Sequence, residues 1–121
     1  LVYAETDFSI IGFPSKLSLT LKLTNIGRGE LLNGKITSCK PYSKNTLNCS
    51  YTDKNVFIPA GKSEQYNLQL DGLLIEEDNI ELVLRFEYKD LYKFEKFVDI
   101  IIQITITNAI DIYTVCEHIK I

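Results

Sequence analysis

Hydrophobic and polar residues alternate in three long stretches of the chain. Leucine occupies every second position from Leu17 to Leu23, and serine, threonine or lysine stands between. The same alternation returns in residues 80–89 and 94–107. A period of two is typical of a β-strand with one face in a core and the other in water. The residues expected to share one core are Leu19, Leu21, Leu23, Leu82, Leu84, Phe86, Ile100, Ile102 and Ile104.

Turn signals divide the chain into seven or eight strands. Asn25 and Gly27, which tolerate positive φ, end the leucine strand, and Asn33-Gly34 predicts a bulge in the next one. The predicted strands span residues 2–13, 16–25, 30–39, 47–58, 63–70, 80–89 and 94–107, and the tail 110–121 is an eighth strand or a short helix. Strands at this spacing predict an all-β, immunoglobulin-like two-sheet β-sandwich of about 7–8 antiparallel strands.

The length favours one domain. We expect residues 1–121 to share a single core, built over 7–106, with 108–121 as a C-terminal strand or tail. The net charge of −3, with both signs mixed, gives no basic field for nucleic acid or anionic lipid. The most apolar stretch, 97–106, is about half the length of a transmembrane helix and predicts a buried strand. Because the sequence starts at Leu1 rather than Met, we expect a processed form, and any membrane helix would precede Leu1.

The spacing of the three cysteines bears on the cellular compartment in which the protein works. A polar run with bend-forming residues separates Cys39 from Cys49, and a disulfide closing it would stabilise the fold by roughly 3 kcal/mol. The alternative is two unrelated buried thiols. Asn48-Cys49-Ser50 fits the N-glycosylation pattern, so Asn48 is a candidate glycan acceptor. Both features favour an extracellular or cell-surface protein. Cys116 is left over, and we expect it to act as a small buried hydrophobe.

Candidate chemistry is sparse. His118, the only histidine, lies two residues from Cys116, and a thiolate–imidazole pair or half a metal site is one interpretation. We favour a solvated histidine near the terminus. Glu76, Glu77 and Asp78 offer oxygen ligands for calcium, but their spacing matches no EF-hand loop, and a solvated connection between strands is the preferred interpretation. No catalytic, cofactor-binding or metal site is therefore predicted, and the chain is not expected to be an enzyme.

Aromatic residues gather around one predicted hairpin. Tyr88, Tyr92, Phe94 and Phe97 alternate there with lysine and glutamate. Tyrosine beside charge at strand ends is typical of protein or sugar contacts, so Tyr88 and Tyr92 are interaction candidates. The alternative, which we favour, is that Phe94 and Phe97 cap the sandwich and the tyrosines cover its rim.

Two sheet edges lack the lysines that usually block strand addition. They are the segments 7–11 and 110–115, the second of which contains Ile110, Ile112 and Tyr113. We expect self-association or partner docking along these edges.

Short motifs give the chain a family resemblance. A strand ending in Leu-Thr-Asn25-Ile-Gly27 is followed by Phe57-Ile-Pro59-Ala-Gly61-Lys-Ser63-Glu and later by Phe86-Glu-Tyr88-Lys-Asp90. Over residues 7–106 this pattern resembles the CARDB/APHP group of immunoglobulin-like domains in archaeal and bacterial surface proteins. It also resembles, more loosely, the sandwich domains of archaeal pilins and archaellum stator proteins, which follow an N-terminal membrane helix.

These features together predict a non-catalytic extracellular module that mediates protein–protein assembly or attachment at the cell surface. One alternative is an archaellum or pilus accessory domain that binds a partner or the surface layer. Another is a carbohydrate-binding accessory domain of a secreted enzyme, which would need exposed aromatic residues in a planar row on one sheet face.

Overall fold

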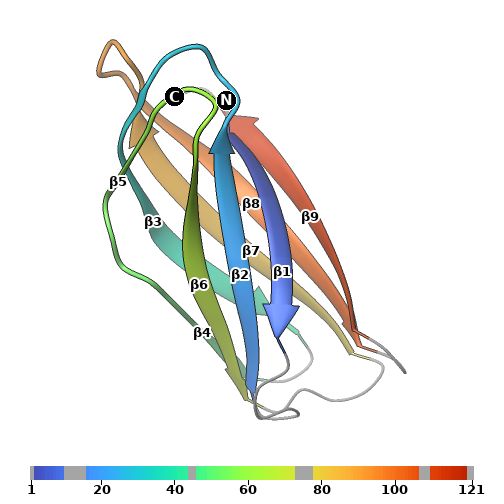
Figure 1. Ribbon diagram of the computed structural model, residues 1–121. Coiled ribbons are helices and arrows are strands. Elements are labelled where there is room, and N and C mark those ends of the chain that lie inside the picture. The colour runs from blue at the N-terminus through green and yellow to red at the C-terminus, as the bar shows by residue number, and fades with distance from the viewer. Residues whose placement is uncertain (1, 10–15, 44–45, 73–77, 107–109, 120–121) are drawn as a thin grey trace.

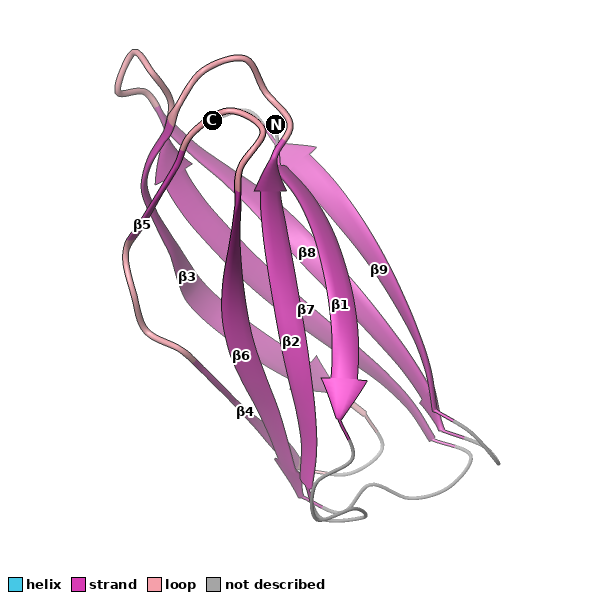
Figure 2. Ribbon diagram, in the orientation of Figure 1, coloured by secondary structure: helices cyan, strands magenta, loops and turns pink. Residues whose placement is uncertain are grey.

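The computed structural model arranges the chain as two packed β-sheets (Figures 1 and 2). It describes residues 2–9, 16–43, 46–72, 78–106 and 110–119, and side chains except those of 7–9, 78 and 110–119. The strands are β1 (Val2–Ser9), β2 (Lys16–Asn25), β3 (Leu31–Tyr42), β4 (Leu47–Tyr51), β5 (Val56–Ile58), β6 (Ser63–Gly72), β7 (Asp78–Lys89), β8 (Glu95–Ile106) and β9 (Ile110–Ile119).

The strand order is that of an immunoglobulin-like sandwich. One sheet has the order β1-β2-β6-β4 and the other β5-β3-β7-β8-β9, with antiparallel pairing throughout the described residues. Apart from the short β5, each sheet thus has four strands. When β5 and β9 are left out and the other seven strands are named A to G in chain order, one sheet has the order A-B-E-D and the other C-F-G, as in an immunoglobulin constant domain. The strand β9 is an addition beside G. The predicted all-β sandwich fold is confirmed.

The core lies between the sheets, where the alternation predicted it. All nine predicted core residues are buried. Tyr66 of β6 meets Phe86 of β7 edge to face, with ring centroids 6.2 Å apart. Val2 and Ala4 of β1 also join this core, which therefore begins before residue 7. Because buried side chains alternate with exposed or half-buried ones along β2, β6, β7 and β8, a slip of one residue in these strands would reverse the two faces.

The predicted fourth strand, 47–58, is wrong as a single element. It divides into β4, which pairs with β6 in one sheet, and β5, which pairs with β3 in the other. The polar residues 52–55 interrupt the alternation, and the chain crosses between the sheets there. The tail, left open between strand and helix, is the strand β9.

Positive φ angles mark other positions than the residues that end the leucine strand. Neither Asn25 nor Gly27 is among the described residues with positive φ, which are Asn33, Gly61, Gly72 and Lys93. Asn33, at φ 51°, lies where the pairing of β3 with β5 and β7 shifts register, so the predicted bulge is confirmed.

A disulfide joins the two sheets along one side of the sandwich. Cys39 lies on β3, Cys49 lies on β4, and their Cα atoms are 6.2 Å apart. The strands β3 and β4 belong to different sheets and are not paired by backbone hydrogen bonds. The disulfide therefore links the two sheets covalently. The predicted Cys39–Cys49 pairing is confirmed.

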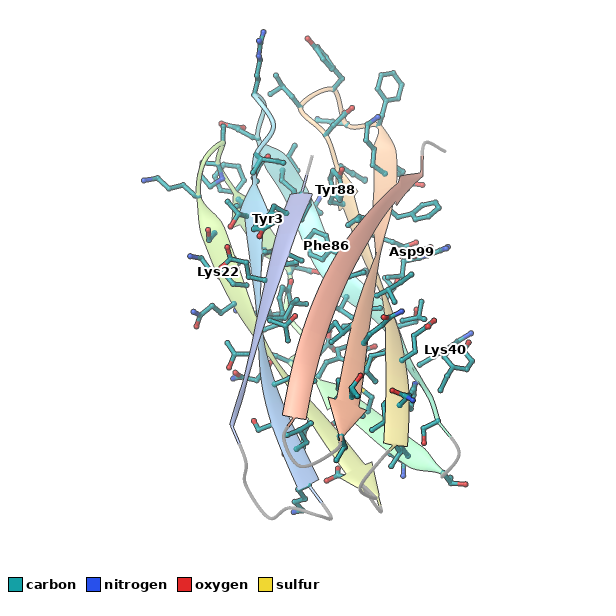
Figure 3. The ribbon with its side chains drawn as sticks, turned by 90° about the vertical axis from the view of Figure 1, so that its right-hand side faces the viewer. Tyr3, Lys22, Lys40, Phe86, Tyr88 and Asp99 are labelled. Atoms are coloured by element: carbon teal, nitrogen blue, oxygen red, sulfur yellow. A yellow bond between two sulfur atoms is a disulfide. The ribbon has the colours of Figure 1, made fainter. Side chains whose placement is uncertain are left out.

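The other side of the sandwich is formed by β1 and β9, the outer strands of their sheets, which lie side by side (Figures 1 and 3). The predicted edge positions are therefore correct for these two strands. Ile110, Ile112 and Tyr113 face Ile106, Ile104 and Gln103 in the β8 register. Their side chains, and residues 10 and 11, lie outside the described residues.

Candidate interaction surface

Exposed apolar side chains gather at one end of the sandwich, which we call the loop end. It comprises the β2–β3 loop (26–30), the β5–β6 turn (59–62) and the β7–β8 turn (90–94), at the top of Figure 1. Ile26, Leu91, Tyr92 and Phe94 are 57%, 51%, 78% and 67% exposed there. The other exposed large hydrophobic residues of the described chain are distributed over three strands, at Tyr3, Tyr42 and Phe57.

The β7–β8 turn holds its apolar residues in a fixed conformation. The backbone N–H groups of Tyr92 and Phe94 both donate to Asp90 Oδ1, each at 2.9 Å. The backbone of Asp90 adds bonds to Phe94 and Lys93, and Lys93 has a φ of 65°. An aspartate that bonds the backbone two residues ahead is the side-chain mimic of a turn. Tyr92 and Phe94 are therefore exposed on a turn whose backbone is held by hydrogen bonds.

Asn25 organises the neighbouring loop. It is only 3% exposed, and its Nδ2 donates to the carbonyl oxygens of Gly29 (2.8 Å) and Ile58 (2.9 Å). Its Oδ1 accepts from Gly27 N–H at 3.0 Å. Its backbone also exchanges hydrogen bonds with the β5–β6 turn, through Lys62 O and Gly61 N–H. The side chain and backbone of one buried residue thus join the β2–β3 loop to Ile58 and to the β5–β6 turn.

The two loops line an open hollow of about 330 Å³. Its lining includes Gly29 and Leu31 from one side and Tyr88, Leu91 and Tyr92 from the other. The loops approach each other closely at Gly29, where an added Cβ would lie 3.3 Å from the Cβ of Leu91. The hollow therefore lies between two neighbouring loops.

Two cationic and two anionic side chains line this hollow: Arg28, Lys96, Glu30 and Asp90. Among the described residues, Arg28, Lys62 and Lys93 of the loop end have no ion-pair partner, whereas Lys96 lies 3.9 Å from Asp90. Glu30 is the unpaired carboxylate of the lining. The three loops of the loop end thus carry three cationic and two anionic side chains.

Tyr88 and Phe94 lie in environments that differ from those expected for them. Tyr88 is buried against Phe86, with ring centroids 5.8 Å apart, and burial raises the pKa of its hydroxyl. It lines the hollow but is no exposed contact. Phe94, expected to cap the sandwich, is largely exposed because it belongs to the turn. Tyr92 is exposed as an interaction candidate should be.

Phe97 also differs from expectation. It is half-buried, and the guanidinium of Arg85 lies 4.0 Å from its ring centroid. Arg85 also bonds both oxygens of Asp99, at 2.9 and 3.1 Å, and this hydrogen bonding raises the pKa of the guanidinium. Phe97 therefore packs against the Arg85–Asp99 ion pair on the face of its sheet and lies outside the loop end.

The remaining predicted site residues do not join the loop end. Asn48 is exposed on β4, where a glycan would have access to solvent. Cys116 and His118 face Ile100 and Val98 in register on β9, but their side chains lie outside the described residues. Glu76 and Glu77 also lie outside them, as does the side chain of Asp78. In the described part, no three His, Cys, Asp or Glu residues are grouped as metal ligands.

Sequence reasoning missed Ile26, Leu91 and the exposure of Phe94. These residues could have been found as apolar residues inside turn motifs, as in Asn25-Ile-Gly27 and Asp90-Leu-Tyr-Lys93. A turn has no strand face turned toward the core, so an apolar residue within it is expected to be exposed.

Comparisons with protein-family models, curated proteins and solved structures find no match to this chain. The fold alone is therefore established, as an all-β two-sheet sandwich. Within the described residues, no helix is long and apolar enough to cross a membrane.

Proposed function

We propose that this chain is a non-catalytic module of an exported protein, and that it mediates protein–protein assembly or attachment at a cell surface through its loop end. The observation that carries the proposal is the group of four exposed apolar side chains on two ordered loops. Large exposed apolar residues that lie together are typical of interaction sites, whereas single ones need no explanation. Tyrosine and arginine, both present here, are also enriched where binding energy concentrates.

Two further features support the proposal. The Cys39–Cys49 disulfide agrees with an oxidising, extracellular setting. The loop conformations are fixed by Asn25 and Asp90, so binding would order few additional residues and lose little conformational entropy. A role as an archaellum or pilus accessory domain is a narrower form of this proposal, in which the partner is an appendage subunit or the surface layer.

The carbohydrate-binding alternative has less support. It requires a planar row of exposed aromatic side chains on one sheet face. Tyr3, Tyr42 and Phe57 instead lie on β1, β3 and β5, and Tyr92 and Phe94 lie on a turn.

Site-specific photocrosslinking in the cell that produces the protein tests the proposal. A photoreactive residue replaces Tyr92, and a matched variant carries it at Tyr42, which is also exposed but lies on β3. We expect a discrete protein adduct from position 92 and none from position 42. If position 92 gives no adduct, or if both positions give the same adducts, the loop end is not the contact surface.

A further inference from the structure

We infer that Asn48 carries an N-linked glycan, and that this glycan blocks strand addition along the open edge of β4. The inference rests on one part of the proposed function, export of the chain, and adds a modification with a structural role. Three properties of the described residues support it: the exposure of Asn48, the composition of the β4 edge, and the distance from the loop end.

Asn48 presents a free amide to solvent. Asn48 and Ser50 are exposed on either side of the half-buried Cys49, so both lie on the outer face of the sheet. Asn48 stands opposite Asp71 of β6, but Oδ1 of Asp71 accepts a hydrogen bond from Nε2 of Gln69 at 2.9 Å. The side chain of Asn48 forms no hydrogen bond with another described residue. Its amide nitrogen is therefore available for modification.

The sequence selects Asn48 among the asparagines of the chain. Asn48-Cys49-Ser50 is its one Asn-X-Ser/Thr triplet, which is the acceptor pattern for glycosylation of exported proteins. The donor is a saccharide linked to a lipid phosphate. Nδ2 of Asn48 forms a bond to the anomeric carbon and loses one proton to solvent, while the bond from this carbon to the phosphate breaks and the lipid phosphate leaves.

The edge of β4 lacks the usual protection against strand addition. It is the outer strand of its sheet, and no described strand pairs with it on the side away from β6 (Figure 1). Charged residues, proline or very short length usually protect such edges. Of the other outer strands, β5 has three residues, β1 contains Glu5 and Asp7, and β9 contains Asp111 and Glu117. The five residues of β4 include neither a charge nor a proline, so its protection has to come from an added group.

A glycan on Asn48 would stand where an added strand has to lie. Paired strands are about 4.8 Å apart, and residues directly opposite each other have Cβ atoms roughly 4.5–5.5 Å apart on the same face. A strand paired with β4 would therefore place one of its side chains against the first sugar. Because this clash is steric, it excludes added strands of any sequence.

The glycan would leave the loop end free. The strand β6 begins at Ser63, beside the β5–β6 turn of the loop end, whereas Asn48 pairs with Asp71 near its other end. Residues 63 and 71 are eight positions apart, which corresponds to roughly 26 Å along a strand. Strand addition can thus be blocked at β4 while a partner protein still reaches the loop end.

Peptide mapping tests for the glycan. The protein is purified from the cell that produces it, reduced, alkylated and digested with trypsin, which releases residues 45–54 between Lys44 and Lys54. We expect most copies of this peptide to carry saccharide mass on Asn48. Ser50→Ala should remove that mass, and Ser50→Thr, which keeps the acceptor pattern, should retain it. An unmodified wild-type peptide would overturn the inference.

Sedimentation velocity tests the role of the glycan. Ser50→Ala lacks the glycan and leaves the edge open, so it should self-associate at roughly tenfold lower concentration than the wild type. Ser50→Lys also lacks the glycan but places a charge on the edge, and it should stay monomeric over the same range. Asn67→Lys added to Ser50→Ala is the matched control, because β6 has a paired strand on both sides, and it should leave self-association unchanged. Both positions are exposed, so each variant should fold.

Two sedimentation results would overturn the inference. Equal behaviour of Ser50→Ala and the wild type would show that the glycan has no role at this edge. Equal self-association of Ser50→Ala and Ser50→Lys would show that the chains associate elsewhere. If the peptide is unmodified but position 92 still crosslinks a protein, the proposed function stands without this inference. If the glycan is present but the crosslink fails, the chain is exported and the loop end is not the contact surface.

Discussion

Replacement of Asn25 by alanine should destabilise the fold more than replacement of any other described asparagine. The side chain is buried and makes three hydrogen bonds, to Gly27, Gly29 and Ile58. Alanine removes all three and leaves partly buried backbone groups without these partners. Each bond contributes roughly 1 kcal/mol net, so the free energy of unfolding should fall by about 3 kcal/mol.

That loss is large for a domain of this size. Stabilities are typically about 5–15 kcal/mol, and a chain of 121 residues unfolds with an entropy of roughly 0.25 kcal/mol/K near 60 °C. The melting temperature should therefore fall by about 12 °C. Urea unfolding followed by far-UV circular dichroism and tyrosine fluorescence measures the change, since the chain has no tryptophan.

Asn67→Ala is the matched control, because Asn67 is exposed on β6 and its side chain should contribute within about 0.5 kcal/mol. A loss below about 1 kcal/mol for Asn25→Ala, or equal losses for both variants, would refute the role assigned to Asn25.

The variant Asn25→Asp keeps the shape of the side chain and removes its hydrogen-bond donor. Its carboxylate would face the carbonyl oxygens of Gly29 and Ile58, which Nδ2 now approaches at 2.8 and 2.9 Å. Repulsion and burial should raise the carboxyl pKa in the folded state above its unfolded value. A group whose pKa is higher in the folded state stabilises the fold at pH values below its unfolded pKa. This stabilisation is lost as the pH rises through the folded pKa. The variant should thus approach wild-type stability in acid and be least stable at neutral pH. A penalty independent of pH would contradict this explanation.

Three further predictions concern packing, titration and the disulfide. Gly34→Ala should cost about 1–3 kcal/mol in urea unfolding, because the new Cβ would lie 2.5 Å from Cζ of Phe86, and adding Phe86→Leu should recover part of the loss; wild-type stability of the single variant would contradict the clash. Burial, with Glu64 nearby, raises the pKa of Tyr66 to about 12, so stability should fall between pH 10 and 12 and fall less in Tyr66→Phe; identical pH profiles would show that Tyr66 is not responsible. Cys39→Ser should cost about 3 kcal/mol under oxidising conditions and nothing under reducing ones, and peptide mapping without reductant should recover Cys39 bonded to Cys49 in the wild type.

Much of the fold was predictable because its signal is local. Leu17 to Leu23 alternate over a full strand, and each of these leucines is buried. Residues 80–89 and 98–106 behave in the same way. The Cys39–Cys49 pair was also predictable, because a short polar run with bend-forming residues separates the two positions. The break in residues 47–58 was missed, since a polar interval does not reveal that the chain changes sheets across it.

The candidate surface was much less predictable. Asn25 was recognised as a strand end, but the sequence did not show that its side chain forms the turn by accepting a hydrogen bond from Gly27 N–H. Its bond to Ile58 spans 33 residues of sequence, so no local pattern encodes it. Phe94 was expected to cap the core, and only the turn geometry at Asp90 places it in solvent.

The sequence by itself determined most of the strands and the faces they bury, and it favoured the pairing of Cys39 with Cys49, because period-two alternation and turn residues act over a few neighbouring positions. Only the tertiary structure decided that Arg28, Leu91 and Tyr92 meet at one end and line an open hollow. Two loops about 60 residues apart in the chain become neighbours only when the sheets pack. The exposed apolar side chains that gather there, Ile26, Leu91, Tyr92 and Phe94, lie on loops between strands and outside the core.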